Sequence, residues 1–123
     1  MSAGGDRKLL GRWGESVVAE DLRRNGCTIL SAGWHCRMGE IDLIASDGTY
    51  LRLVEVKLRK DAHFAQAREF VDRRKQEKLR LAAQLYLAEN PTTLQPRFDV
   101  AEVYAPEGIA TKAPKILYIE NAF

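Results

Sequence analysis

Hydrophobic residues follow two different periods along the chain. Helical spacing covers residues 6–25, where Gly26 is placed to end the helix, and it returns over residues 66–89. Strand-like runs occupy residues 27–37, 41–45, 51–58, 97–104 and 115–119. The element order α-β-β-β-α-β(-β) predicts an α/β sandwich with a mixed sheet.

The two strands in the middle of the chain predict a β-hairpin. Residues 46–49 join them, and Asp47-Gly48 is a strong signal for a two-residue turn. With these two residues as the loop, Glu40 lies opposite Glu55 on the neighbouring strand. Because two opposed carboxylates repel, this register calls for a cation between the strands.

The charged residues of the hairpin gather on one face. Since side chains alternate along a strand, Asp42, Glu55 and Lys57 project from the same side. A three-residue loop would instead place Asp42 and Glu55 on opposite faces. The other face is apolar and carries Ile41, Leu43, Ala45, Val54, Val56 and Leu58.

The hairpin has more carboxylates than one ammonium group can balance. Glu40, Asp42 and Glu55 stand beside the single ammonium of Lys57, and half-buried carboxylates without a partner are costly. A divalent ion would satisfy them, and oxygen donors favour Mg²⁺ or Mn²⁺ over Zn²⁺. The alternative is a solvent-facing hairpin with cross-strand ion pairs.

An acidic residue on one strand followed by Glu-x-Lys on the next resembles the PD-(D/E)XK core of restriction-endonuclease-like nucleases. Over roughly residues 7–104 the chain is similar to the YraN family of small bacterial proteins. It departs at Gly33 and His35, where that family usually has Asn and Arg. The residues that carry the resemblance are Gly14-Glu15, Cys36-Arg37-x-Gly39-Glu40-Ile41-Asp42-Leu43-Ile44-Ala45, Val54-Glu55-Val56-Lys57-x-Arg59, Ala82-Ala83-x-x-Tyr86-Leu87 and Arg97-Phe98-Asp99-Val100.

The resemblance implies a restriction-endonuclease-like fold and metal-dependent hydrolysis of DNA phosphodiester bonds. Asp42 and Glu55 would then hold one or two Mg²⁺ or Mn²⁺ ions, with Glu40 and Glu15 completing the acidic shell. Lys57 would orient or help deprotonate the attacking water and stabilise the developing negative charge. These five residues are the expected catalytic and metal-binding set.

The same resemblance extends to supporting residues and to the substrate. Gln76, a polar residue of the second helix, is expected near Lys57. Similarity to Holliday-junction resolvases, which act as dimers, favours branched DNA as the substrate and leaves a homodimer open.

Basic residues are concentrated in one segment, although the net charge is only +2. Residues 52–80 contain ten of the nineteen basic residues and five acidic ones. This excess begins at the hairpin and continues onto the second helix, where it could hold phosphates, or it could be a solvated helix face. The expected nucleic-acid contacts are Arg37, Arg59, Lys60, Lys75 and Lys78.

Length and composition limit the class of protein. The chain has 123 residues, 46% of them hydrophobic, which suits one domain over residues 1–123. No apolar run approaches the roughly 18 residues of a membrane span, and no signal peptide is evident. Cys27 and Cys36 fit neither a metal spacing nor a disulfide framework. We therefore expect a cytoplasmic protein with free thiols and no membrane partner.

Two other functions stay open. A domain with the nuclease fold could bind nucleic acid or take part in an assembly with little or no turnover. The charged hairpin could also be an ion-pair surface of a structural interaction protein.

Overall fold

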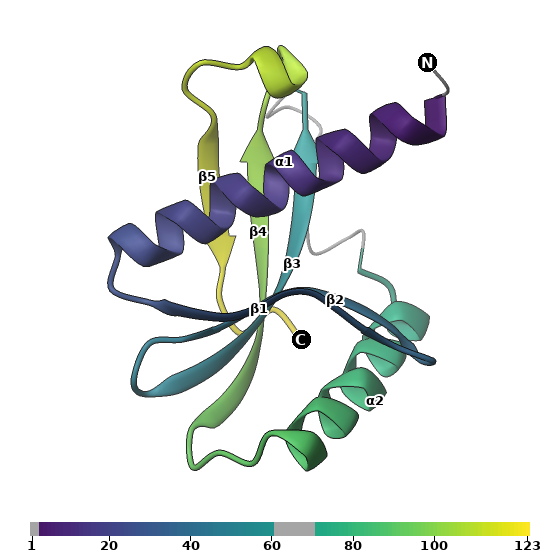
Figure 1. The fold of residues 1–123 in the computed structure, drawn as a ribbon, viewed down its shortest axis with the longest axis vertical. Helices are drawn as coiled ribbons and strands as arrows, with labels where there is room; N and C mark the ends of the chain where they lie inside the picture. Colours follow the sequence, from purple (N-terminus) through teal and green to yellow (C-terminus); the bar gives the residue numbers. More distant parts are fainter. Residues whose placement is uncertain (1–2, 61–70) are drawn as a thin grey trace.

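The computed structural model describes residues 3–60 and 71–123. Its elements follow the order expected from the sequence, which confirms the predicted α/β class (Figure 1). Neither of the long helices in these ranges is apolar enough over its length to cross a bilayer. The elements are α1 (Ala3–Arg24), β1 (Thr28–Cys36), β2 (Gly39–Ser46), β3 (Tyr50–Arg59), α2 (Arg73–Glu89), β4 (Gln95–Tyr104), the 3₁₀ helix η3 (Gly108–Ala110) and β5 (Lys115–Ile119).

The five strands form one mixed sheet in the order β1-β2-β3-β4-β5. Strands β3 and β4 are parallel, whereas every other neighbouring pair is antiparallel. A parallel pair needs a crossover connection, and α2 lies within the one between β3 and β4. Figure 1 shows α1 crossing the sheet in front of β3, β4 and β5, while α2 runs along its lower right side.

The two helices cover opposite faces of the sheet. Val18 and Leu22 of α1 pack with a cluster that contains Leu43 and Val54. The alternate strand residues, including Ile44 and Leu53, pack with the buried side of α2 (Leu79, Ala82, Ala83 and Tyr86). This alternation makes the molecule three layers deep, with the sheet between the two helices.

Helix boundaries follow local capping. Gly26 adopts a φ of +91° just after α1, as predicted for the residue that ends this helix. The second helix was predicted over residues 66–89, but within the described part of the chain it begins at Arg73, and residues 66–70 lie outside the description. Its start is determined by Asp72, whose Oδ1 accepts a hydrogen bond from the Lys75 backbone N at 2.8 Å.

The hairpin between β2 and β3 has a wider loop than predicted. Ser46 pairs with Leu51, so the strands are shifted by two residues and the continued register places Asp42, not Glu40, opposite Glu55. Asp47 causes the shift: its Oδ1 accepts the backbone N–H groups of residues 49 and 50 at 2.8 and 2.7 Å, which stabilises the longer loop. A shift of two residues preserves the alternation of faces over the paired residues 43–46 and 51–54.

The end of β2 departs from strict alternation. Ile41 was predicted on the face of Leu43, but it packs with Trp34 in the cluster under α2. Figure 1 shows the cause, because β1 and β2 curve across the direction of β4 and β5. The register of β1 also shifts between Ile29 and Ser31. Figure 1 shows this end of β2 beside α2, while the carboxylates of Glu40 and Asp42 lie near Glu15 of α1.

Candidate functional site

A polar cavity of about 520 Å³ opens where α1, β2, β3 and the first turn of α2 meet. All four acidic residues predicted for the site line it, and so does one of the predicted basic residues. The lining residues are Lys8, Gly11, Arg12, Glu15, Glu40, Asp42, Glu55 and Lys75. Residues far apart in the sequence therefore form one charged surface.

Three carboxylates form the acidic centre of this cavity. Glu15 from α1 and Glu40 and Asp42 from β2 each offer one oxygen, and these oxygens lie within 4.8 Å of one another. Glu40 and Asp42 are two residues apart on a strand and so share a face. Asp42 is also fixed from the neighbouring strand, because its Oδ2 accepts a hydrogen bond from the Val56 backbone N at 2.9 Å.

Negative charge is crowded at this centre. Burial, reinforced by the charge of Glu55, raises the pKa of Asp42 to about 7, although the Val56 N–H opposes the change. Burial and the charges of Glu40 and Glu55 likewise raise the pKa of Glu15, with Arg12 acting in the opposite direction. The carboxylates therefore repel one another, and a cation bound among them would relieve that repulsion.

Two glycines of α1 shape the approach to the sheet. A Cβ at Gly14 would lie 3.1 Å from a Leu58 methyl group, so the missing side chain lets α1 pack closely on β3 and brings Glu15 to the cavity. Gly11 is different, because it lines the cavity and a Cβ there would meet nothing within 4 Å.

Glu55 pairs with two lysines instead of joining the three carboxylates. Its Oε1 lies 2.6 Å from Lys75 Nζ and 3.7 Å from Lys57 Nζ, and its side chain is only 7% exposed. The predicted metal-ligand set was Asp42, Glu55 and Glu40; the structure brings Glu15 to Asp42 and Glu40 and turns Glu55 toward the lysines.

The two lysines have different electrostatic surroundings. Burial lowers the pKa of Lys57, and Glu55 opposes this only in part while Lys75 adds to it. Burial also acts against the charge of Lys75, but its hydrogen bond to Glu55 and the charge of Glu55 outweigh it and raise the pKa of Lys75. Lys75 is therefore the firmly charged partner, and Lys57 gives up its proton more readily than an ordinary lysine.

The donor set is of the kind that hard divalent ions prefer. Of the described residues that line the cavity, none is His or Cys, and the three neighbouring ligands are carboxylate oxygens. Such donors suit Mg²⁺ or Mn²⁺ better than Zn²⁺. The residues present thus fit the ion that the sequence predicted.

Lys8 and Arg12 are cavity residues that the sequence interpretation missed. Both are exposed and lie on the face of α1 that carries Glu15. Positions 8, 12 and 15 are spaced as neighbours on one side of a helix, so the position of Glu15 could have identified them.

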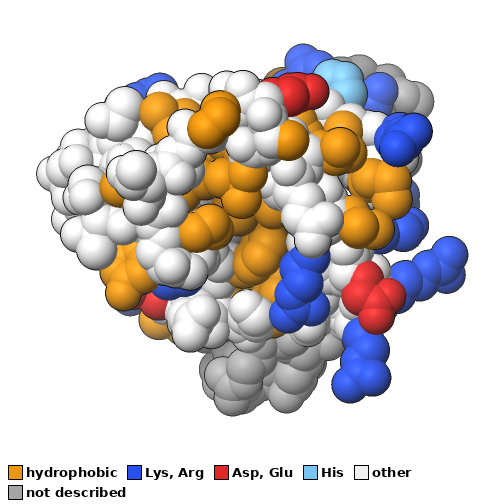
Figure 2. Space-filling view, turned by 90° about the horizontal axis from the view of Figure 1, so that it is seen from below, with side chains coloured by type: hydrophobic (Ala, Val, Ile, Leu, Met, Phe, Trp, Pro, Cys, Tyr) orange, Lys and Arg blue, Asp and Glu red, His pale blue; other side chains and the backbone are white. Residues whose placement is uncertain are grey.

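The predicted nucleic-acid contacts occupy varied positions. Lys75 lies in the cavity, and the exposed Lys78 follows it on α2 beside Arg74. Arg37 and Lys60 are exposed, at the ends of β1 and β3. Figure 2 shows Lys and Arg side chains gathered on the right of the molecule, the side on which α1 and α2 begin in Figure 1.

Two predicted residues make internal contacts. Arg59 Nε lies 3.5 Å from Glu102 Oε2, and the two side chains are 16% and 1% exposed, so Arg59 takes part in a buried ion pair. Gln76 Nε2 donates a hydrogen bond to the Val71 carbonyl at 2.8 Å. It is not one of the residues that line the acidic cavity.

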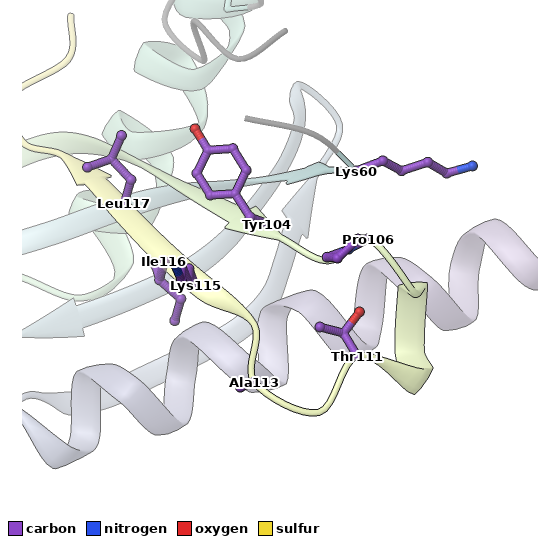
Figure 3. A pocket seen from close by; sticks show the side chains of 8 residues that line it. All are labelled: Lys60, Tyr104, Pro106, Thr111, Ala113, Lys115, Ile116 and Leu117. Carbon is purple, nitrogen blue, oxygen red and sulfur yellow. The ribbon is translucent and has the colours of Figure 1, made fainter. Parts of the chain in front are cut away.

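A second cavity, of about 590 Å³, lies at the β4–β5 end of the sheet (Figure 3). Apolar groups of Tyr104, Ile116 and Leu117 form much of its wall, and Lys60 points away from Tyr104 and Leu117. No carboxylate is among its described lining residues. The chemistry of its described lining therefore differs from that of the acidic cavity.

Comparison with known proteins identifies the family. The family model described as uncharacterised protein family UPF0102 matches residues 14–103. A UPF0102 protein of Pelotomaculum thermopropionicum is 44% identical over 119 residues, which are 95% of this chain and 97% of that protein. UPF0102 proteins of Ectopseudomonas mendocina and Acetivibrio thermocellus are 39% and 38% identical, covering 93% and 96% of this chain and 93% of each relative. This protein therefore belongs to the UPF0102 family.

Proposed function

We propose that this protein is a metal-dependent nuclease that hydrolyses phosphodiester bonds in DNA, with Mg²⁺ or Mn²⁺ as the ion. The observation that carries the proposal is that three clustered carboxylates share one cavity with Glu55 and Lys75, and that Lys57 pairs with the same Glu55. Oxygens of Glu15, Glu40 and Asp42 lie within 4.8 Å of one another, and lysines contact the neighbouring Glu55. Carboxylates beside lysines provide both an ion site and positive charge for a phosphate.

Glu15, Glu40 and Asp42 would hold the ion. When bound, the ion polarises a phosphoryl oxygen and lowers the pKa of a water molecule. Asp42 is the most firmly positioned of the three ligands, since the Val56 N–H holds its Oδ2. Glu15 depends on the close contact of α1 with β3 at Gly14.

The lysines would act on the phosphate and the attacking water. Lys57 Nζ is held near Glu55, and its lowered pKa suits transfer of a proton as well as stabilisation of charge on the phosphate. Lys75 remains charged and supplies fixed positive potential beside it. Glu55 positions both amines through one carboxylate oxygen.

Positive charge on both helices suits a polyanionic substrate. Lys8 and Arg12 on α1 line the acidic cavity, and Lys78 on α2 lines a neighbouring cavity that shares Lys75 with it. These residues would contact phosphates on either side of the scissile bond. The resemblance to Holliday-junction resolvases makes branched DNA the first substrate to test, and a homodimer the first assembly to test.

A second candidate function is a nucleic-acid-binding module with little turnover. It is favoured by the engagement of Glu55 with Lys75 at 2.6 Å, which removes one expected ligand from the acidic centre. In that case the basic residues would bind DNA without cleavage.

Labelled branched and linear DNAs, incubated with Mg²⁺, Mn²⁺, Ca²⁺ or EDTA, separate the two functions. We expect cleavage with Mg²⁺ or Mn²⁺ that is lost in Glu15→Gln and kept in Glu20→Gln, an exposed glutamate on α1 that pairs with Arg24. Binding of DNA without cleavage under all metal conditions would favour the binding module. Equal cleavage by both variants would reject the site.

A further inference from the structure

Lys75 is held in place at both its backbone and its side chain. Its backbone N donates to the Asp72 cap of α2 at 2.8 Å, which fixes where the side chain leaves the helix. Its Nζ then reaches Glu55 Oε1 at 2.6 Å, on a strand twenty residues earlier in the chain. The Lys75 side chain is 39% exposed, so its ammonium stands at the border between the buried glutamate and solvent.

This pair changes the charge that the cavity offers to metal ions. Glu55 Oε1 also lies 3.7 Å from Lys57 Nζ, so two ammonium groups share one carboxylate oxygen. When ionised, the four carboxylates and two lysines leave a formal charge that one dication balances. Lys8 and Arg12 also line the cavity, but both are exposed and solvent screens their charges.

We propose that Lys75 takes the place of a second divalent ion at Glu55, so that the site binds a single ion through Glu15, Glu40 and Asp42. Lys75 is then a positioning residue that determines metal stoichiometry. The ammonium supplies the positive charge beside the substrate phosphate that a second ion would otherwise supply. The inference rests on the proposed function for the presence of an ion, and it goes further by naming the number of ions and the group that limits it.

The direction of the Lys75 pKa supports this assignment. Although burial disfavours its charge, Glu55 outweighs that effect and keeps the ammonium protonated. Removal of this ammonium would leave a buried carboxylate with only the more distant Lys57, and a carboxylate in that state attracts another cation.

The test is Mn²⁺ stoichiometry without DNA, measured by calorimetry and by the spin-resonance signal of free Mn²⁺. The wild-type protein should bind one ion per chain, Lys75→Met should bind two, and the control Lys78→Met, one turn further along α2, should bind one. Glu55→Gln should keep the single ion with affinity within about threefold, less than the roughly tenfold cost of losing a supporting group. Lys75→Gln repeats the test if Lys75→Met does not fold.

The outcomes are distinct. Two ions on the wild-type protein, one ion on both Lys75 variants, or loss of the ion in Glu55→Gln would each overturn the inference. If the wild-type protein binds two ions and cleaves DNA, the inference fails and the proposed function stands. If it binds one ion and cleaves no DNA, the proposed function fails and the single-ion site stands, whereas absence of Mn²⁺ binding overturns both.

Discussion

The Asp42 carboxylate is fixed by the backbone of Val56, whose N–H donates to Oδ2 at 2.9 Å across two strands. The backbone pairing of β2 with β3 ends at Leu43 and Val54, so the Asp42 carboxylate gives the Val56 N–H a partner beyond that end. The same hydrogen bond fixes the carboxylate in the wall of the cavity. A ligand that is held this way needs little reorganisation to bind an ion. The same position places it beside Glu15 and Glu55, whose charges oppose its ionisation.

Asp42→Asn should change how stability depends on pH when no metal is present. The pKa of Asp42 is about 7 in the folded protein, against 3.8 for the ordinary group, so the folded state keeps a proton that the unfolded chain releases. This contribution to stability is complete below about pH 4 and is lost as the pH rises through about 7. The asparagine variant lacks this titration.

Denaturant unfolding in EDTA at pH 5 and pH 8 measures the effect. Relative to the wild-type protein, Asp42→Asn should gain about 2 kcal/mol in free energy of unfolding between pH 5 and pH 8. Mn²⁺ at pH 8 should then stabilise the wild-type protein and leave the variant unchanged. A stability difference that is the same at both pH values would contradict the assignment.

Gly14→Ala and Gly11→Ala should differ in stability, although both add a methyl group to α1. Alanine favours a helix over glycine by about 1 kcal/mol, and at Gly11 a Cβ meets nothing within 4 Å. At Gly14 the Cβ would lie 3.1 Å from Leu58. We expect Gly14→Ala to be less stable than Gly11→Ala by about 1–3 kcal/mol, the range for overpacking, as measured by thermal and urea unfolding.

Lys57→Met should slow cleavage without removing the metal ion. Loss of a group that transfers a proton or stabilises charge commonly costs about 10²–10⁴ in rate. Binding of Mn²⁺ should persist, because Lys57 lies at Glu55 and not among the three clustered carboxylates. Single-turnover cleavage measures the rate, and Lys115→Met on the edge strand is the control. An unchanged rate in Lys57→Met would exclude the role.

DNA affinity should depend on salt through residues on both helices. Each phosphate contact that is removed should reduce the slope of log affinity against log salt by about 1. We expect this for Lys8→Gln on α1 and Lys78→Gln on α2, measured with Ca²⁺ so that cleavage does not interfere. Lys112→Gln is the control, since this exposed lysine lies in the loop before β5. If the salt dependence of DNA affinity changes only in Lys112→Gln, the DNA does not bind along the two helices.

Local patterns in the sequence determined the element order and the faces of the strands. Helical spacing and Gly26 predicted the end of the first helix, and the run at 115–119 predicted β5. The hairpin register was wrong by two residues, yet Asp42 and Glu55 still share a face. An even shift preserves alternation, so this part of the site could be predicted even though the loop length could not.

Only the tertiary structure decided which charged groups meet. Lys75 of α2 reaches Glu55 of β3, and Glu15 of α1 comes close to Asp42 because Gly14 lets α1 pack against Leu58. Such contacts depend on sheet twist and on the distance between packed layers, which no periodicity along the chain encodes. Periodicity predicts which way a side chain points from its own helix or strand. Which residue it contacts is decided only when the layers pack together.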